Sequence, residues 1–131
     1  MKKLKDWFQE QKITEVECII PDLTGIARGK IMPADKFLRN EGLRMPEAVF
    51  LQSVTGEWIP YENLFDVDPA EIDMQLRPDP STTCVVPWVE EPTAQGIHDC
   101  IHHDGTPVEL SPRNVLKRVL KKYEEIGLKP M

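Results

Sequence analysis

The stretch Asp73-Met-Gln-Leu-Arg-Pro-Asp-Pro-Ser-Thr-Thr-Cys-Val-Val-Pro-Trp88 constrains the fold of this chain more than any other segment. Apolar residues at Met74 and Leu76 precede its centre, and the run Cys84-Val-Val86 follows it. Both runs have the length and residue types of strands, and the prolines between them are typical of a connection. The segment therefore predicts two strands joined by a turn.

Two prolines determine where the sheet is interrupted. Pro78 and Pro80 each fix φ and lack an amide hydrogen, so the hydrogen-bond ladder must stop between them. The backbone groups freed in this way need other partners. The side chains that we expect to supply them are those of Asp79, Ser81 and Thr82.

Upstream of this segment, alternating apolar residues predict a β-hairpin. One strand is expected over residues 16–21 and its return over 26–32, and Gly25 in the turn can adopt the positive φ that such a turn needs. The turn fixes which residues face each other across the two strands. The residues expected on the buried face of the first strand are Val16, Cys18 and Ile20.

Apolar residues at helical spacing predict a helix at each end of the chain. Leu4, Trp7 and Phe8 form a stripe that we expect to pack against the sheet. The second helix begins at Ser111-Pro112, where serine caps and proline suits the first position, and it ends at Gly127. The residues predicted to form its buried stripe are Val115, Leu116, Val119, Leu120 and Tyr123.

Between these helices the pattern mixes strands with a short helix. We predict a helix that opens at Pro33, a brief strand over 47–52, a long loop over 53–68 and a last strand over 97–103. A hairpin, a helix and then further strands indicate an α+β fold. The 131 residues suit one domain, and no internal repeat is present.

Composition excludes several classes of function. A net charge of −6 argues against a nucleic-acid partner. The chain has no apolar run that could span a bilayer and no signal-peptide pattern, so we expect a cytoplasmic protein without a membrane partner. Cys18, Cys84 and Cys100 are odd in number and lie in strand-like runs, which favours small core residues over disulfides.

Two local motifs suggest ligands, but their spacing argues against both. On a strand, His98 and His102 would lie about 13 Å apart, too far to share one zinc ion, so a polar strand end is favoured over a metal site. The segment Gly25-Ile-Ala-Arg-Gly-Lys30 lacks the hydroxyl residue that follows lysine in a phosphate loop, because Ile31 stands there. Hairpin structure accounts for it better.

Four segments in a fixed order resemble the N-terminal domain of glutamine synthetase-type ligases. They are Asp22-Leu-Thr-Gly-Ile-Ala-Arg-Gly-Lys30, a loop that ends in Trp58, Leu76-Arg-Pro-Asp-Pro-Ser-Thr82 and Gly105-Thr-Pro-Val-Glu-Leu-Ser-Pro-Arg113. The resemblance covers residues from about 16 to 127. Within the family, the chain looks most similar to the subgroup that attaches glutamate to larger amines such as putrescine.

The resemblance implies a β-grasp-like mixed sheet with a crossing helix, and it implies the organisation of a longer enzyme. Residues 1–14 would form an N-terminal helix, 15–110 the β-grasp domain and 111–131 a helix that leads into a catalytic domain absent from this chain. ATP and Mg²⁺ or Mn²⁺ would be held by that domain, so this chain would not be catalytic alone. Its partners would be the catalytic domains of its own and the adjacent subunit in a homo-oligomeric ring. A free-standing β-grasp binding module is the alternative.

The loop 50–61 is the candidate site. Aromatic residues on a polar loop, here Trp58 and Tyr61, either form the wall of a pocket or hold the loop in place. The resemblance implies that this loop reaches the active site of the neighbouring subunit. The substrate-binding residues it implies are Gln52, Ser53 and Trp58, together with Asp73, which could equally be a strand-entry residue.

Leu51 departs from the family pattern F-D-G-S-S, which has aspartate at this position. The resemblance implies that this aspartate helps to hold ammonium. A carboxylate attracts a small cation, whereas leucine does not. The departure argues against ammonium and favours an amine with a hydrocarbon body. Gln52 or Glu57 is a candidate for orienting such an amine.

Overall fold

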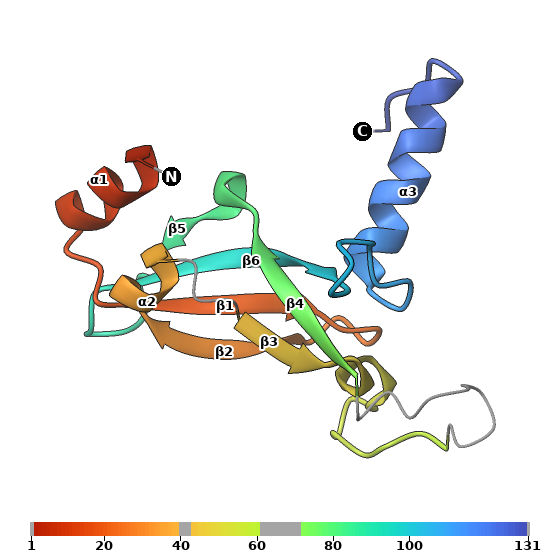
Figure 1. Ribbon diagram of the computed structural model, residues 1–131, viewed down its shortest axis with the longest axis horizontal. Helices are drawn as coiled ribbons and strands as arrows, with labels where there is room; N and C mark the ends of the chain where they lie inside the picture. Colours follow the sequence, from red (N-terminus) through yellow and green to blue (C-terminus); the bar gives the residue numbers. More distant parts are fainter. Residues whose placement is uncertain (1, 40–42, 61–71, 131) are drawn as a thin grey trace.

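A curled mixed sheet organises the chain, and helices flank it (Figure 1). The computed structural model describes residues 2–39, 43–60 and 72–130. The helices are α1 (Lys2–Glu10), α2 (Ala34–Arg39) and α3 (Pro112–Glu125), with short 3-10 helices η1 (Glu47–Leu51) and η2 (Pro80–Thr82). The strands are β1 (Glu15–Pro21), β2 (Ala27–Pro33), β3 (Leu43–Pro46), β4 (Asp73–Pro78), β5 (Cys84–Val85) and β6 (Thr93–Ile101). The predicted α+β class is confirmed.

The sheet brings the first and last strands together at its centre. Its order is β2-β1-β6-β4-β3, with β1 and β6 parallel and the other neighbours antiparallel. The β1–β2 hairpin has the predicted turn, in which Gly25 has φ of 82°. The side chains on the buried face of β1 are Val16, Cys18 and Ile20, as expected.

The proline segment joins two strands that lie one after the other along β6. The two predicted strands are β4 and β5, and both pair with β6, at 98–101 and at 94–95 respectively. The ladder does stop at Pro78, as predicted. Asp79 accepts a hydrogen bond from the Ser81 amide at 3.1 Å, and Thr82 Oγ1 accepts one from the Ile97 amide at 2.9 Å.

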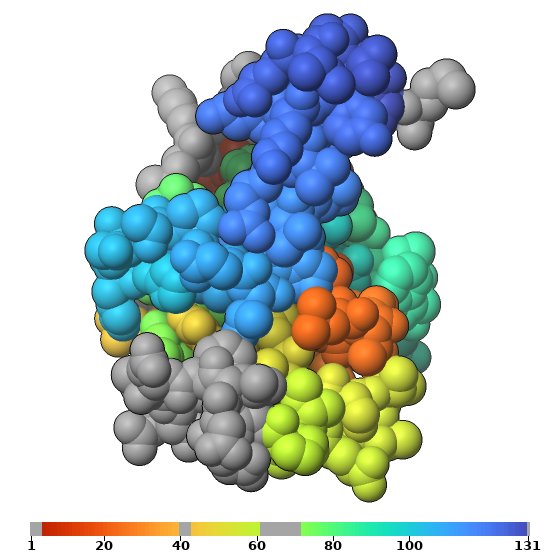
Figure 2. Space-filling view, turned by 90° about the vertical axis from the view of Figure 1, so that its right-hand side faces the viewer, coloured from red at the N-terminus to blue at the C-terminus, as the bar shows by residue number. Residues whose placement is uncertain are grey.

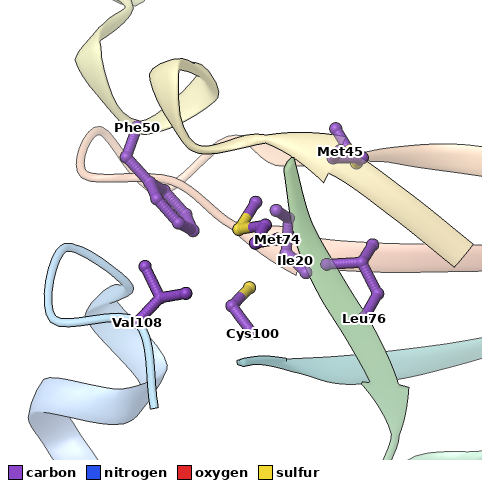
Figure 3. Packing of buried hydrophobic residues seen from close by; sticks show 7 residues of the cluster. All are labelled: Ile20, Met45, Phe50, Met74, Leu76, Cys100 and Val108. Carbon is purple, nitrogen blue, oxygen red and sulfur yellow. The ribbon is translucent and has the colours of Figure 1, made fainter. Parts of the chain in front are cut away.

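Two apolar clusters form the core, one toward each end of the sheet. The first joins Phe50 of η1 to the strands and to Val108, and Figure 3 shows these side chains converging. The second packs α1 and α2 against the sheet, with Phe8 and Phe37 stacked at 5.7 Å between ring centroids. The predicted packing of the N-terminal helix on the sheet is confirmed.

Three element predictions require correction. Residues 47–51 form the 3-10 helix η1, so the strand predicted over 47–52 is wrong. The strand β3 at 43–46 was not predicted, and β6 begins at Thr93 rather than at Ile97. A short apolar run fits a strand and a helical turn equally well, and here burial of Ala48, Phe50 and Leu51 favours the turn.

The helix α3 extends away from the sheet and contacts it mainly through its first turn (Figures 1 and 2). Asn114 is buried and donates to the carbonyl of Cys100 at 2.7 Å. The predicted buried stripe is wrong, because Leu116 is 56% exposed and the side chains of Val115, Val119 and Tyr123 are also exposed. Ser111 occupies the N-cap position but makes no side-chain capping bond. Gly127 ends the helix with φ of 76°.

The cysteines divide into two kinds. Cys18 and Cys100 are buried, and burial raises the pKa of each thiol to about 12. Cys84 is exposed in the two-residue strand β5, so the expectation that it is a core residue is wrong. All three are free thiols. No helix in the described part of the chain is long and apolar enough to cross a bilayer.

Candidate functional site

The first part of the predicted long loop is a tight hairpin over residues 51–59. Gln52 and Trp58 form an isolated antiparallel bridge, and the Ile59 amide donates to the Leu51 carbonyl at 3.0 Å. Gly56 has φ of 84°, which permits the chain to reverse. The structure thus brings Gln52, Ser53 and Trp58 together on one hairpin, and their role in substrate binding stays a prediction. The predictions for Tyr61 and for the loop at 61–68 concern residues outside the described ranges.

Ser53 is the centre of hydrogen bonding in this hairpin. Its amide donates to the Glu57 carbonyl at 2.8 Å, and its carbonyl accepts from the Gly56 amide at 3.0 Å. Its hydroxyl accepts from the Glu57 amide at 3.1 Å and contacts Thr55 Oγ1 at 2.9 Å. The hydroxyl therefore stiffens the turn as a side-chain substitute for a backbone bond.

The hairpin has a buried base and an apolar, exposed tip. Phe50 and Leu51 in η1 are buried, and Phe50 lies in the first core cluster (Figure 3). Beyond them, Val54 is 65% exposed and Trp58 is 55% exposed. Large apolar side chains at the end of a fixed support are suited to contact a ligand or a partner surface.

The turn of the β1–β2 hairpin contains a buried carboxylate. Asp22 is 3% exposed, and its Oδ1 accepts from the amides of Thr24 and Ile26 at 2.9 and 2.8 Å. Its Oδ2 accepts from Arg28 Nε at 2.8 Å. Burial alone would raise the pKa of Asp22, but these donors, Arg28 foremost, lower the pKa to about 2. The carboxylate stays charged at neutral pH.

Arg28 joins this turn to the candidate hairpin. The guanidinium donates from Nη2 to the Ser53 carbonyl at 3.2 Å while its Nε holds Asp22. Figure 2 shows the turn, in orange, directly against the yellow-green loop that contains the hairpin. Lys30, two residues on, donates to the Arg44 carbonyl at 2.9 Å. The two cations of the Asp22–Lys30 motif thus bind backbone carbonyls within this chain.

Asp73, the fourth predicted site residue, lies apart from the hairpin tip. It is exposed at the start of β4, where it is paired with Pro46, the residue before η1. The neighbouring Ile72 carbonyl accepts from the Glu47 amide at 2.9 Å. Asp73 therefore lies next to the start of η1, the 3-10 helix that precedes the hairpin. A role for Asp73 in binding stays a prediction.

A second ion-pair group, not predicted from the sequence, lies under η1. His102 Nδ1 is 2.8 Å from Oε1 of the buried Glu47, and His102 Nε2 is 3.1 Å from Oε2 of the exposed Glu109. The hydrogen bond with Glu109 raises the pKa of His102, and the negative charge of Glu47 raises it further. Partial burial of the ring lowers this pKa, but by less. Burial raises the pKa of Glu47. His102 thus connects η1 to the segment before α3.

We expect this group to make stability depend on pH. Because the folded pKa of His102 is raised, its contribution is fully present below its ordinary value of about 6.5 and is lost as pH rises through the folded value. His102→Gln should therefore cost about 0.5–1 kcal/mol near pH 6 and less near pH 9. Urea unfolding at both values measures the difference. His103→Gln, at an exposed neighbour, is the control; a pH-independent cost for His102→Gln would contradict the prediction.

A third group ties α3 to the sheet. Arg113 pairs with Asp79 and, at 2.8 Å, with Asp99, and Lys117 Nζ lies 2.5 Å from Asp99 Oδ2. Asp79 comes from the proline segment and Arg113 from the last motif, so two of the four resembling segments meet here. This group fixes where α3 leaves the sheet.

Within the described ranges, no group of three or more His, Cys, Asp or Glu side chains is placed to hold a metal ion. His98 is buried, with Nδ1 2.9 Å from the Gly96 carbonyl and its ring edge against Phe37. His102 has the carboxylate partners given above.

Comparison with known proteins identifies the class of protein to which this fold belongs. A crystal structure of a glutamine synthase homologue superposes with a TM-score of 0.73 at 21% identity, over 88% of this chain and 28% of that one. A GmaS–ADP complex superposes with a TM-score of 0.70 at 25% identity, over 96% of this chain and 26% of that one. The fold is that of a part of glutamine synthetase homologues.

Curated relatives agree. A glutamate–isopropylamine ligase from a Pseudomonas species is 32% identical over 130 residues, which are 97% of this chain and 28% of the relative. A glutamine synthetase from Pyrococcus horikoshii is 30% identical over 121 residues, 92% of this chain and 24% of the relative. No protein-family model matches. The chain is homologous to the ligases of the glutamine synthetase family, and it spans about a quarter of the length of these relatives.

Proposed function

We propose that this chain is the N-terminal part of an ATP-dependent ligase that joins glutamate to an amine, and that it supplies one wall of an active site completed between subunits. The observation that carries the proposal is the hairpin 51–59. It holds Trp58 and Val54 outward on a support fixed by the buried η1 and by Arg28. A surface of this kind offers an apolar contact area to a substrate or to a neighbouring domain.

The substrate class follows from the residues at this hairpin. Leu51 stands where the family pattern has aspartate, and it is buried. A leucine cannot attract ammonium, whereas the exposed Val54 and Trp58 suit the hydrocarbon part of an alkylamine. Gln52 and Glu57 flank them and can orient an ammonium group. The homologous glutamate–isopropylamine ligase supports an alkylamine such as isopropylamine.

The remaining chemistry belongs to a domain outside this chain. ATP and a divalent metal would be bound there and would activate the glutamate carboxylate by phosphorylation. Within this proposal, residues 1–14 are an N-terminal helix, 15–110 the β-grasp domain and 111–131 the connection to the catalytic domain. The exposed stripe of α3, which includes Leu116 and is followed at the helix end by the 70% exposed Ile126, is the surface that this domain and the adjacent subunit of a homo-oligomeric ring would cover.

An amine panel tests the proposal on the ligase that contains this chain. With glutamate and Mg-ATP present, we expect kcat/KM for isopropylamine or putrescine to exceed that for ammonium by at least about tenfold, because burying two or three methylenes contributes that much. Phosphate release and mass spectrometry of the γ-glutamyl amide measure the reaction. If ammonium is the preferred amine, the assignment of an alkylamine is wrong.

Two tryptophan variants make this experiment specific for the hairpin. Trp58→Ala should raise the KM for the alkylamine and reduce the preference over ammonium. Trp88→Ala removes an even more exposed indole, 72% accessible, from a segment outside the hairpin and should leave the preference unchanged. Equal effects of the two variants would contradict a role for Trp58 at the amine.

A further inference from the structure

One edge of the Arg28 guanidinium is fixed to the turn of the β1–β2 hairpin. Arg28 lies opposite Ile20 in the β1–β2 ladder, so its side chain is on the core-facing side of the sheet. Its Nε donates to Asp22, whose other oxygen is already committed to the Thr24 and Ile26 amides. Because the guanidinium is planar, fixing Nε also fixes the direction of its terminal nitrogens.

The other edge of Arg28 binds the centre of the candidate hairpin. Nη2 donates to the carbonyl of Ser53, the residue whose amide, hydroxyl and carbonyl all bond within the turn. Gln52, the bridge partner of Trp58, precedes Ser53 directly. A displacement of the Ser53 carbonyl therefore moves the whole hairpin, including Trp58, relative to the sheet.

We propose that Arg28 is a positioning residue that sets the placement of hairpin 51–59 at the amine side of the ligase active site. It does so as a rigid bridge from the buried Asp22 carboxylate to the Ser53 carbonyl. This inference rests on the proposed function, because the hairpin is a site only if the chain is part of such a ligase. The two hydrogen bonds that form the bridge lie within this chain and do not depend on the proposed function.

Removing the bridge should affect catalysis as well as stability, because Arg28→Met also leaves the buried Asp22 carboxylate without its cation. The base of the hairpin remains packed through Phe50, and Asp22 Oδ1 keeps its bonds to the turn. The hairpin, however, loses the hydrogen bond that joins it to β2, and a misplacement of about 1 Å costs on the order of 100-fold in rate. The effect should appear in the parameters for the amine and not in those for ATP.

The kinetic test uses two substitutions of Arg28 in the full-length ligase. Arg28→Met should lower kcat/KM for the preferred amine by about 10–100-fold and change the KM for ATP by less than about twofold. Arg28→Lys keeps a positive charge beside Asp22, so it should fold normally, but it lacks the planar fork and should restore the amine parameters only in part. Lys30→Met is the matched control, because it removes a cation from the same strand that bonds the Arg44 carbonyl instead.

A second measurement does not depend on activity. Amide hydrogen exchange at Glu57 and Ile59, whose amides bond to Ser53 Oγ and to the Leu51 carbonyl, reports the order of the hairpin. We expect exchange there to be at least about tenfold faster in Arg28→Met and unchanged in Lys30→Met.

The outcomes separate the two proposals. If both Arg28 variants match the unaltered ligase in amine kcat/KM and in exchange at 57 and 59, the positioning role is overturned. The same holds if Lys30→Met reproduces their effects. If the unaltered ligase forms no amide with any amine, the proposed function fails, while faster exchange in Arg28→Met alone still establishes the bridge from Asp22 to the hairpin.

Discussion

Gly29→Ala should lower the free energy of unfolding by about 3 kcal/mol or more, a large share of the 5–15 kcal/mol typical of a domain. A Cβ built on Gly29 would lie 2.1 Å from the Cys18 carbonyl oxygen and 3.1 Å from Ile19 Cα. Both atoms are backbone, so no rotamer change can relieve the contact. The strands β1 and β2 would have to separate, and β1 carries the fully buried Val16, Cys18 and Ile20.

Urea unfolding followed by far-ultraviolet circular dichroism measures this cost, and the same sheet contains a matched control. Gly96 lies in the neighbouring part of the same sheet, in β6, and is buried whereas Gly29 is exposed, but a Cβ on Gly96 would meet only Thr83 Oγ1, at an ordinary 3.6 Å. Gly96→Ala should therefore change stability by less than about 1 kcal/mol. Equal urea midpoints for the two variants would show that the contact between a Cβ at position 29 and the Cys18 carbonyl does not lower the free energy of unfolding.

Asp22→Ala should cost about 3 kcal/mol at pH 7, because it orphans the Thr24 and Ile26 amides and leaves Arg28 without its buried counter-charge. The penalty should shrink in acid. The pKa of Asp22 is lowered from 3.8 to about 2, so its contribution is present above 3.8 and is lost as pH falls through 2. About 2 kcal/mol of the difference should disappear between pH 7 and pH 2.

Asp104 provides the control for Asp22, since the two carboxylates make the same local turn. Asp104 Oδ1 accepts from the amide and the hydroxyl of Thr106, as Asp22 Oδ1 does from Thr24, but Asp104 is exposed and binds no arginine. Unfolding of both variants at pH 7 and pH 2 separates the turn from the buried ion pair. If Asp104→Ala is as damaging as Asp22→Ala, the Arg28 pair contributes nothing beyond the turn.

Local patterns were sufficient to predict much of this fold. Alternation at 16–21 and the positive φ of Gly25 depend on neighbours in sequence, and both are confirmed. The break at Pro78 follows from the chemistry of one residue and is also confirmed. The register of β6 against both β1 and β4 depends on residues far apart, so the start of β6 and its pairing with β5 were not predicted.

The candidate site shows the same limit. Trp58 was predicted from its residue type, and the structure places it on the exposed side of the hairpin. The bond from Arg28 to Ser53 spans 25 residues, and no periodicity in the sequence indicates it. The stripe of α3 was predicted correctly as apolar and wrongly as buried, because periodicity identifies a face but not what covers it.

The parallel pairing of β1 with β6 has a consequence for biosynthesis. Glu15 and Thr93 are partners in that ladder although 78 residues separate them. A nascent chain that has emerged only as far as β4 lacks β6, the strand that pairs with the second edge of β1. The segment between β1 and β6 is a long loop to close, and its closure slows formation of a folding nucleus. The domain therefore completes its centre late, after residue 101 has left the ribosome, and its earlier intermediates depend on protection from aggregation.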